Sequence, residues 1–235
     1  VEWSTLIEQV AQSTIRQFRT GSPPVAIGQL PMRKETRWRL ERIVPEGDIA
    51  VLFGPGGAGK SLFALACALA IQHAWDGLGL APTQGNGLYL DWEWSYQEHN
   101  DRLLSIEAGM QLPFRPHLLY RYCYRKLEDD IEEVQRLVVD NNIRFVVVDS
   151  AVPALGGARE AKENAEPLFS ALRSLEGVSA LVISHTTKDP KEKTKTPYGD
   201  VFFVNRARHV LEMRTVSETE GELQLALYKF KSNLP

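Results

Sequence analysis

Short apolar runs alternate with longer amphipathic segments along most of the 235-residue chain. The apolar runs have the length of strands and lie at Ile49–Phe53, Gly87–Trp92, Leu118–Tyr124, Phe145–Val148 and Ala180–Ile183. The segments between them have helical spacing and lie at Leu62–His73, Tyr96–Glu107, Ile131–Asn141 and Ala165–Leu175. Continuous apolar strands that alternate with helices are typical of a parallel sheet covered on both faces. The pattern therefore predicts an α/β fold.

The two ends of the chain depart from this alternation. Residues 1–20 place apolar side chains at helical spacing, and a linker rich in glycine and proline follows them. Near the other end, Ala207–Thr215 and Glu222–Lys231 read as two strands joined by a polar turn around Glu218–Gly221. We expect the first segment to be a helix and the last two to form a hairpin.

Composition and charge narrow the range of partners. The chain carries 27 lysines and arginines against 30 aspartates and glutamates, which gives a net charge of −3. This excludes a strongly cationic nucleic-acid coat but permits a local basic groove. Two cysteines, Cys67 and Cys123, are too few for a disulfide framework and lie outside any metal-binding spacing. The sequence has no apolar run of about 18 residues and no signal-peptide pattern, so we expect a cytoplasmic protein with no membrane partner.

A phosphate-binding loop is the most specific motif in the chain. Gly54-Pro55-Gly56-Gly57-Ala58-Gly59-Lys60-Ser61 follows an apolar strand and, with Leu62, opens an apolar helix. Its glycines let backbone N–H groups turn toward phosphate oxygens, and a helix N-terminus attracts the anion. Lys60 supplies a charge for the β- and γ-phosphates, and the Ser61 hydroxyl is a ligand for Mg²⁺. The guanine-reading Asn/Thr-Lys-x-Asp motif is absent, so the sequence predicts ATP and Mg²⁺ as cofactors.

Three other strand ends carry side chains that suit nucleotide hydrolysis. Asp149 ends a buried apolar run, where its carboxylate can hold the water shell of Mg²⁺ beside Ser61. Asp91 and Glu93 fall on one face of another strand end. We favour Glu93 as the general base because ligands bind at the carboxyl ends of such strands, and Asp91 is the alternative. His185 follows a third strand, where it is expected to sense the γ-phosphate by hydrogen bonding.

These motifs, in this order, resemble the RecA superfamily and, within it, the hexameric replicative helicases of the RepA type. The resemblance rests on Pro45–Asp48, the phosphate loop, Gly87–Glu93, Phe145–Asp149 and Ile183–Lys188. It implies a RecA-like three-layer sandwich with a mainly parallel central sheet and a C-terminal β-hairpin. It also implies a homo-oligomer, either a ring, for which we expect six subunits, or a filament. Residues 35–235 would form the ATPase core, and residues 1–34 would serve as an oligomerisation arm.

The same resemblance implies that a neighbouring subunit completes each active site. The expected inter-subunit cations are Arg206, Arg208, Lys229 and Lys231. Arg208 fits the position of the arginine best, and an arginine supplied in trans would stabilise charge on the γ-phosphoryl group. Lys231 is the expected cation of the terminal element, because Asn233 stands where many relatives carry arginine. The structural alternative for Arg208 is a surface pair with a local acid such as Glu212.

Two loops are expected to contact single-stranded DNA, because the corresponding loops of RecA-like proteins face the ring centre or the filament axis. Their basic residues are Arg159 and Lys162 in Ala151–Asn164, and Lys188, Lys191, Lys193 and Lys195 in Lys188–Pro197. Lysines on such loops can follow phosphates without reading the base sequence. The alternative is a solvated surface loop, since Asp189 and Glu192 are interleaved with the lysines.

Three functions fit these features. The first, which we favour, is an ATP-hydrolysing motor on single-stranded DNA, either a helicase or a loader in replication or repair. The second is a strand-exchange recombinase or its paralogue, because Phe18-Arg19-Thr20-Gly21 is similar to a Phe-x-x-Ala tether except at Gly21. The third is a nucleotide-dependent oligomeric switch that binds no nucleic acid, of the circadian-clock ATPase kind.

Overall fold

The computed structural model describes residues 2–20, 26, 28, 35–93, 95–112, 118–186 and 201–234. The chain divides into two compact units, Val1–Glu35 and Thr36–Pro235. The first unit contains helix α1 (Trp3–Thr20), so the helix predicted for residues 1–20 is present. The apolar side chains of Trp3, Ile7 and Val10 on this helix are exposed.

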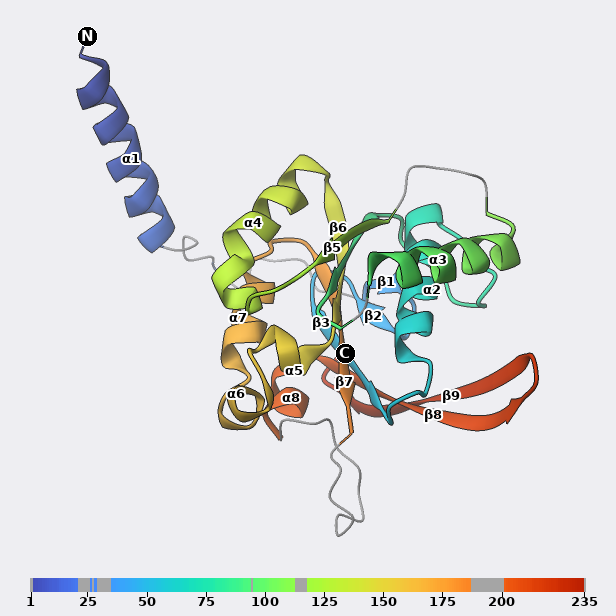
Figure 1. The fold of residues 1–235 in the computed structure, drawn as a ribbon. Coiled ribbons are helices and arrows are strands. Elements are labelled where there is room, and N and C mark those ends of the chain that lie inside the picture. The colour runs from blue at the N-terminus through green and yellow to red at the C-terminus, as the bar shows by residue number, and fades with distance from the viewer. Residues whose placement is uncertain are drawn as a thin grey trace. The chain divides into compact units, whose positions relative to one another are not determined.

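A seven-stranded sheet forms the centre of the second unit (Figure 1), with the strand order β5-β4-β6-β7-β3-β8-β9. The strands are β3 (Ile49–Gly54), β4 (Asn86–Asp91), β5 (Leu119–Tyr122), β6 (Ile143–Asp149), β7 (Ser179–His185), β8 (His209–Thr219) and β9 (Glu222–Ser232). In sheet order, each strand from β5 through β4, β6, β7 and β3 to β8 pairs in parallel with the next, and β9 pairs antiparallel with β8. The predicted α/β fold with a mainly parallel sheet and a C-terminal hairpin is therefore confirmed.

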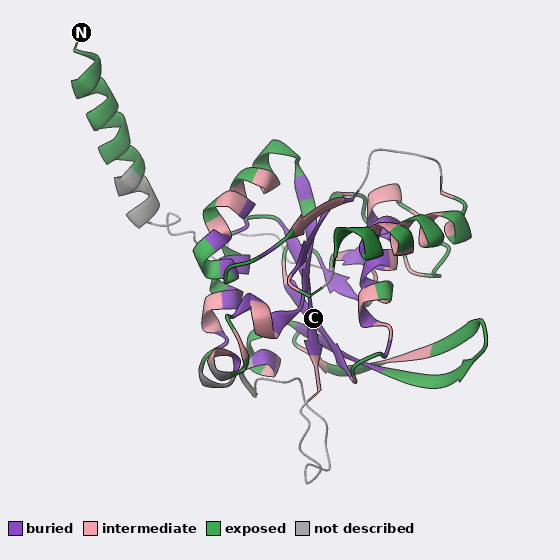
Figure 2. Ribbon diagram, viewed as in Figure 1, coloured by how far each residue is buried: buried purple, intermediate pink, exposed green. Residues whose placement is uncertain are grey.

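Helices cover both faces of this sheet and give it three layers (Figure 1). The helices are α2 (Lys60–His73), α3 (Tyr96–Met110), α4 (Leu127–Asp140), α5 (Ala151–Ala154), α6 (Ala158–Glu163), α7 (Glu166–Arg173) and α8 (Val201–Arg206). Alternation along β6 directs Phe145 and Val147 toward the core under α2 and α3, and Val146 and Val148 toward the core under α4–α7. Buried residues accordingly concentrate in the sheet and the helix faces that cover it (Figure 2). No helix among the described residues is both long and apolar enough to cross a bilayer.

Local side-chain chemistry sets the start of α3. The Ser95 Oγ accepts a hydrogen bond from the Glu98 backbone N–H at 3.4 Å, and the Ser95 hydroxyl donates to the Glu98 carboxylate at 3.4 Å. This reciprocal pair satisfies a backbone donor that the first turn of a helix leaves without a partner. The helix therefore begins directly after the strand end that carries Glu93, and it keeps a fixed position next to that strand end.

A small hairpin that the apolar pattern does not predict precedes the sheet. Strand β1 (Trp38–Leu40) pairs antiparallel with β2 (Val44–Pro45). The segment is rich in basic residues, which a sequence pattern places in solvent, but Arg39 is buried. Its guanidinium lies 3.3 Å from the Glu46 carboxylate and donates to two backbone carbonyls of the segment after α2. A paired and hydrogen-bonded arginine can thus occupy a position where the pattern alone indicates solvent exposure.

We predict that Gly54→Ala lowers the stability of the fold. A Cβ added to Gly54 would lie 2.5 Å from the backbone oxygen of Met213 on β8, and this backbone is held in the sheet. Overpacking of this kind costs about 1–3 kcal/mol, so the free energy of unfolding in urea should fall by that amount. Gly56→Ala is the matched control, since nothing lies within 4 Å of its added Cβ. Equal unfolding free energies for the two variants would contradict this account.

Candidate nucleotide-binding site

The phosphate loop joins the end of β3 to the start of α2. Gly57 and Gly59 have φ angles of 75° and 78°, which glycine adopts without the steric cost that a Cβ brings. Gly59 immediately precedes α2, and no side chain caps the helix there. The first N–H groups of a helix lack partners within it, so this end offers donors and a positive dipole to an anion.

Lys60 is buried at the first position of α2. Its Nζ donates to the backbone oxygens of Gly54 at 3.0 Å and Pro55 at 2.6 Å. Burial lowers the pKa of Lys60, and the charges of Asp149 and Glu93 offset part of that effect. The ammonium group is therefore held inside the loop by carbonyl oxygens that phosphate oxygens can replace.

Asp149 ends β6 next to the start of α2. The Tyr89 hydroxyl donates to its Oδ2 at 2.6 Å, and the Ser61 hydroxyl donates to the same carboxylate. Burial raises the pKa of Asp149, and these two hydrogen bonds offset part of the rise. A hydroxyl and a carboxylate are oxygen ligands of the kind that Mg²⁺ prefers. Ser61 and Asp149 therefore fit the magnesium site predicted for them.

Glu93 lies just beyond β4, and one third of its side chain is exposed. The Ser150 hydroxyl donates to its Oε1, and the Nε2 atom of His185 lies 3.7 Å from the same oxygen. The pKa of Glu93 lies below its usual value, mainly because of His185 and to a smaller extent because of the hydrogen bond from Ser150, and burial opposes this shift. Glu93 is thus ionised at neutral pH and open to solvent, as a general base must be.

His185 ends β7 directly beside the phosphate loop. It is the register partner of Gly54, and the next residue, Thr186, donates its backbone N–H to the Gly54 oxygen at 3.2 Å. The side chain of His185 is 42% exposed. The structure therefore brings His185, Glu93 and the phosphate loop together at one edge of the sheet.

Asp91, the alternative base, is fully buried. It accepts hydrogen bonds from the Glu93 backbone N–H at 2.9 Å and the Tyr120 hydroxyl at 2.8 Å, and His99 Nε2 lies 2.9 Å from its Oδ2. Burial opposes ionisation, but these contacts together lower the pKa of Asp91. Asp91 is therefore a buried, ionised carboxylate with two hydrogen-bond donors and an adjacent imidazole, a setting that favours Glu93 as the base.

Sequence reasoning missed Tyr89, His99 and Tyr120, which surround the two buried carboxylates. They come from β4, α3 and β5, and no linear motif connects these three elements. The one usable signal is the alternation along β4, which places Tyr89 on the same face as Asp91.

The predicted inter-subunit arginines both contact acids of their own chain. Arg208 Nε lies 3.3 Å from Asp48 Oδ2, and Arg206 Nη1 lies 2.7 Å from Glu166 Oε2. Glu212, considered as the local partner of Arg208, instead binds Arg214 through two hydrogen bonds of 2.7 and 2.8 Å. The prediction that Arg208 or Arg206 acts across an interface stays a prediction.

The two predicted inter-subunit lysines on β9 have different surroundings. Lys231 Nζ donates to three backbone oxygens around the end of α8, those of Val204 at 2.5 Å and of Asn205 and Ala207 at 3.2 Å. Burial, followed by the charge of Arg208, lowers the pKa of Lys231. Lys231 thus stabilises the C-terminal end of a helix in its own chain.

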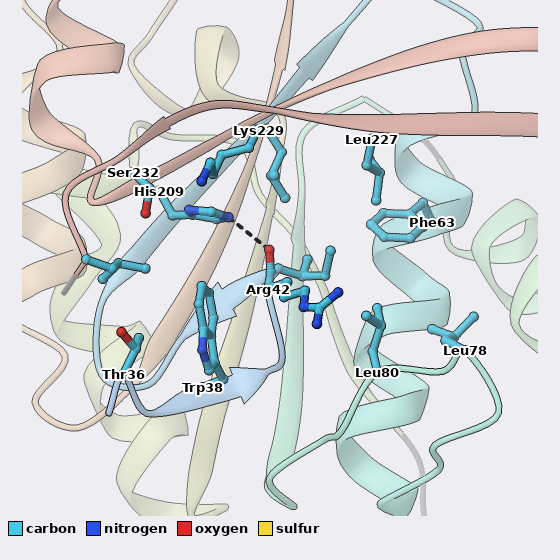
Figure 3. A pocket seen from close by; sticks show the side chains of 13 residues that line it. Thr36, Trp38, Arg42, Phe63, Leu78, Leu80, His209, Leu227, Lys229 and Ser232 are labelled. Atoms are coloured by element: carbon cyan, nitrogen blue, oxygen red, sulfur yellow. Dashed lines mark hydrogen bonds between the residues drawn. The ribbon is translucent and has the colours of Figure 1, made fainter. Parts of the chain in front are cut away.

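Lys229 lines a separate cavity of about 810 Å³ beside the first turn of α2 (Figure 3). The other principal lining side chains are Trp38, Phe63, Leu80, Leu211 and Leu227. Within this cavity His209 Nε2 lies 2.9 Å from the Arg42 backbone oxygen (Figure 3). Among the described residues that line it, none carries a carboxylate. The cavity therefore lacks the acidic ligand of the magnesium site and is distinct from it.

The predicted DNA contacts lie mostly beyond what the structure describes. Lys188, Lys191, Lys193 and Lys195 fall outside the described residues. Arg159 and Lys162 belong to α6, because the segment expected as a loop after β6 contains the two short helices α5 and α6 instead. The resemblance to RecA-like proteins gave no sign of these helices, which are short: α5 contains Pro153, and Gly156-Gly157 separates it from α6.

The chain matches one family of known proteins. Residues 22–191 match the AAA domain family, and this range contains the phosphate loop, Glu93, Asp149 and His185. No curated protein sequence matches the chain.

Lys60→Ala should weaken nucleotide binding strongly. The substitution removes the only charge that the loop itself places among the phosphates, and a hydrogen bond to a charged group contributes about 1.5–3 kcal/mol, or roughly 10- to 100-fold in affinity. Titration calorimetry with ATP and Mg²⁺ measures this change. Lys126→Ala is a charge-matched control, since Lys126 precedes α4 on the opposite face of the sheet. Wild-type affinity in the Lys60 variant would contradict the assignment of the site.

Proposed function

The chain belongs to the AAA domain family, and we propose that it is an ATP-hydrolysing, RecA-like motor that acts on single-stranded DNA as a helicase or loader in replication or repair. One observation supports the hydrolytic part above all others. Lys60, Ser61, Asp149 and Glu93, from three segments of the chain, meet at one edge of the sheet. This is the set of groups that phosphoryl transfer to water requires.

The first step is the binding of ATP by the phosphate loop. The N–H groups of the loop and of the first turn of α2 bind the phosphate oxygens, and the Lys60 ammonium exchanges its two carbonyl contacts for the β- and γ-phosphates. The Ser61 hydroxyl would be a ligand for Mg²⁺, and the Asp149 carboxylate would hold the water shell of the ion. The ion would supply positive charge for the β- and γ-phosphate oxygens.

Hydrolysis requires a base next to the γ-phosphate. Glu93 is ionised and partly exposed, and it lies close enough to Lys60 for its charge to raise the pKa of that lysine. It can orient a water molecule and take up its proton. His185 contacts the same Glu93 oxygen from the strand beside the phosphate loop. We assign His185 the role of linking the state of the γ-phosphate to the segment that follows β7.

We further propose that the protein assembles into a ring, for which we expect six subunits, or into a filament. Arg208 is 58% exposed and pairs with Asp48 at the surface. Such exposed pairs contribute about 0–1 kcal/mol, so an ATP-bound neighbour can take over the guanidinium at little cost. The exposed apolar stripe on α1 is the second feature that fits an assembly, since isolated apolar stripes of this kind normally cover another surface.

Basic residues supply the proposed contact with DNA. Arg159 and Lys162 follow β6, and Lys188, Lys191, Lys193 and Lys195 follow β7, so both sets come after strands that end at the nucleotide site. Their position couples DNA binding to the state of the nucleotide. With a net charge of −3, the chain depends on such local clusters for affinity, and the affinity should fall steeply as salt is added.

ATPase rates with and without single-stranded DNA, measured across a salt series, test this function. We expect DNA to raise the rate and the increase to disappear at high salt. Hydrolysis that is indifferent to DNA at every salt concentration would favour the oligomeric switch. Strand exchange by the purified protein would favour the recombinase.

Glu93→Gln should retain ATP affinity and lose about 10²- to 10⁴-fold in turnover, the usual contribution of a general base.

Mixing two inactive variants tests whether Arg208 acts across an interface. Arg208→Ala should leave ATP affinity unchanged and lower hydrolysis by about 10³-fold or more, as for an arginine supplied in trans. In an equal mixture with Glu93→Gln chains, about a quarter of the interfaces pair an intact Glu93 with an intact Arg208, so activity should return to that level. Arg214→Ala is the control, because Arg214 lies on β8, which follows Arg208, but binds Glu212. No recovery in the mixture would place Arg208 in a structural role.

A further inference from the structure

A buried network of tyrosine, histidine and carboxylate side chains lies behind the two acids of the proposed site. Odd-numbered residues of β4 face α2 and α3, and this face carries Tyr89 and Asp91. Asp149 lies on the same face of the neighbouring strand, as the register partner of Asp91. Two carboxylates therefore lie side by side in the interior, where like charges repel strongly.

These two carboxylates have different hydrogen-bond partners. Asp149 receives the Tyr89 hydroxyl at 2.6 Å and the Ser61 hydroxyl. Asp91 receives the Tyr120 hydroxyl at 2.8 Å and the Glu93 backbone N–H at 2.9 Å, with His99 Nε2 at 2.9 Å. Asp149 is thus turned toward the phosphate loop, whereas Asp91 binds the backbone N–H of Glu93.

The rings of this network pack against one another and restrict its geometry. The ring centroids of Tyr89 and His99 are 4.9 Å apart, those of Tyr89 and Tyr120 are 6.4 Å apart, and those of His99 and Tyr120 are 5.4 Å apart. Because the rings come from β4, α3 and β5, the network ties three elements to the strand ends. A hydroxyl on a ring packed in this way donates from a fixed position.

We propose that Tyr89 and Asp91 are positioning residues of the ATPase site: Tyr89 fixes the orientation in which Asp149 faces Mg²⁺, and Asp91 fixes the backbone that carries Glu93. This inference rests on the proposed function, and it assigns each residue an effect on a different step. Tyr89 acts on the metal, and Asp91 acts on the base. The two effects are therefore separable by experiment.

Tyr89→Phe tests the first assignment, because it removes the hydroxyl and leaves the packed ring in place. Loss of one hydrogen bond to a buried charged group should weaken metal binding by about tenfold. The affinity of the nucleotide-loaded protein for Mn²⁺, read by electron paramagnetic resonance with a non-hydrolysable ATP analogue, should fall by that factor. The Mg²⁺ concentration for half-maximal hydrolysis should rise equally, while ATP affinity without metal stays unchanged.

Tyr96→Phe is the matched control, since Tyr96 lies on α3 and most of its side chain is exposed. It should leave Mn²⁺ affinity and turnover at wild-type values. Wild-type Mn²⁺ affinity in Tyr89→Phe would overturn the role of Tyr89. Equal losses of ATP affinity with and without metal would also overturn it, because they indicate general damage to the site.

Tyr120→Phe tests the second assignment by removing one donor from Asp91 and none from Asp149. We expect kcat to fall by about three- to tenfold with no change in KM for ATP or in Mn²⁺ affinity. Asp91→Asn should show a larger loss of kcat. A change in Mn²⁺ affinity in Tyr120→Phe, which leaves both carboxylate charges in place, or an unchanged kcat in both variants would overturn the role of Asp91. Failure of the wild-type protein to hydrolyse ATP would instead refute the proposed function, so the two failures are distinguishable.

Discussion

Parallel pairing of β3, β4, β6 and β7 is the constraint on which the whole site depends. Their carboxyl ends lie at a single edge, so the residues that follow each strand meet there even though they are far apart in sequence. Gly54 and His185 are register partners, and so are Asp91 and Asp149. The pairing requires strands that are buried on both faces, and the continuous apolar runs of this chain satisfy that requirement. The same feature that builds the core thus assembles the site.

Several charges are buried at this edge, and each one is compensated locally. Lys60 is held by two carbonyl oxygens, Asp149 by two hydroxyls, and Asp91 by two hydrogen-bond donors and an adjacent imidazole. An uncompensated charge in such surroundings would cost several kcal/mol. The compensation differs in kind, because the partners of Asp91 belong to the sheet and α3, whereas the two carbonyl contacts of Lys60 and the Ser61 contact of Asp149 are ones that a nucleotide and its metal ion can replace. The binding groups of the site are therefore those with exchangeable contacts.

What could be predicted from the sequence follows from how local each signal is. The residues Gly54–Ser61 form a continuous motif between a strand and a helix, so the loop, the fold class and the strand ends at Asp149 and His185 were all accessible. The hairpin at Trp38–Pro45 was not, because its buried Arg39 depends on distant carbonyls for its hydrogen bonds. The ring network around Asp91 was not accessible either, since it forms only when β4, α3 and β5 pack together. Interactions that combine side chains from three elements leave no periodic trace in one chain.

The basic residues near α8 differ in how much it would cost to exchange their present contacts for those of another molecule. Lys231 donates to three backbone oxygens, and its withdrawal would leave the end of α8 without those partners. Arg206 contacts Glu166 at 2.7 Å, and the neighbouring Arg173 contacts the same glutamate. Arg208 has a single, longer contact with Asp48 at the surface. Exchange of a partner is least costly where the existing contact is longest and most exposed. Of these cations, Arg208 therefore has the contact that costs least to exchange, as the inter-subunit role proposed for it requires.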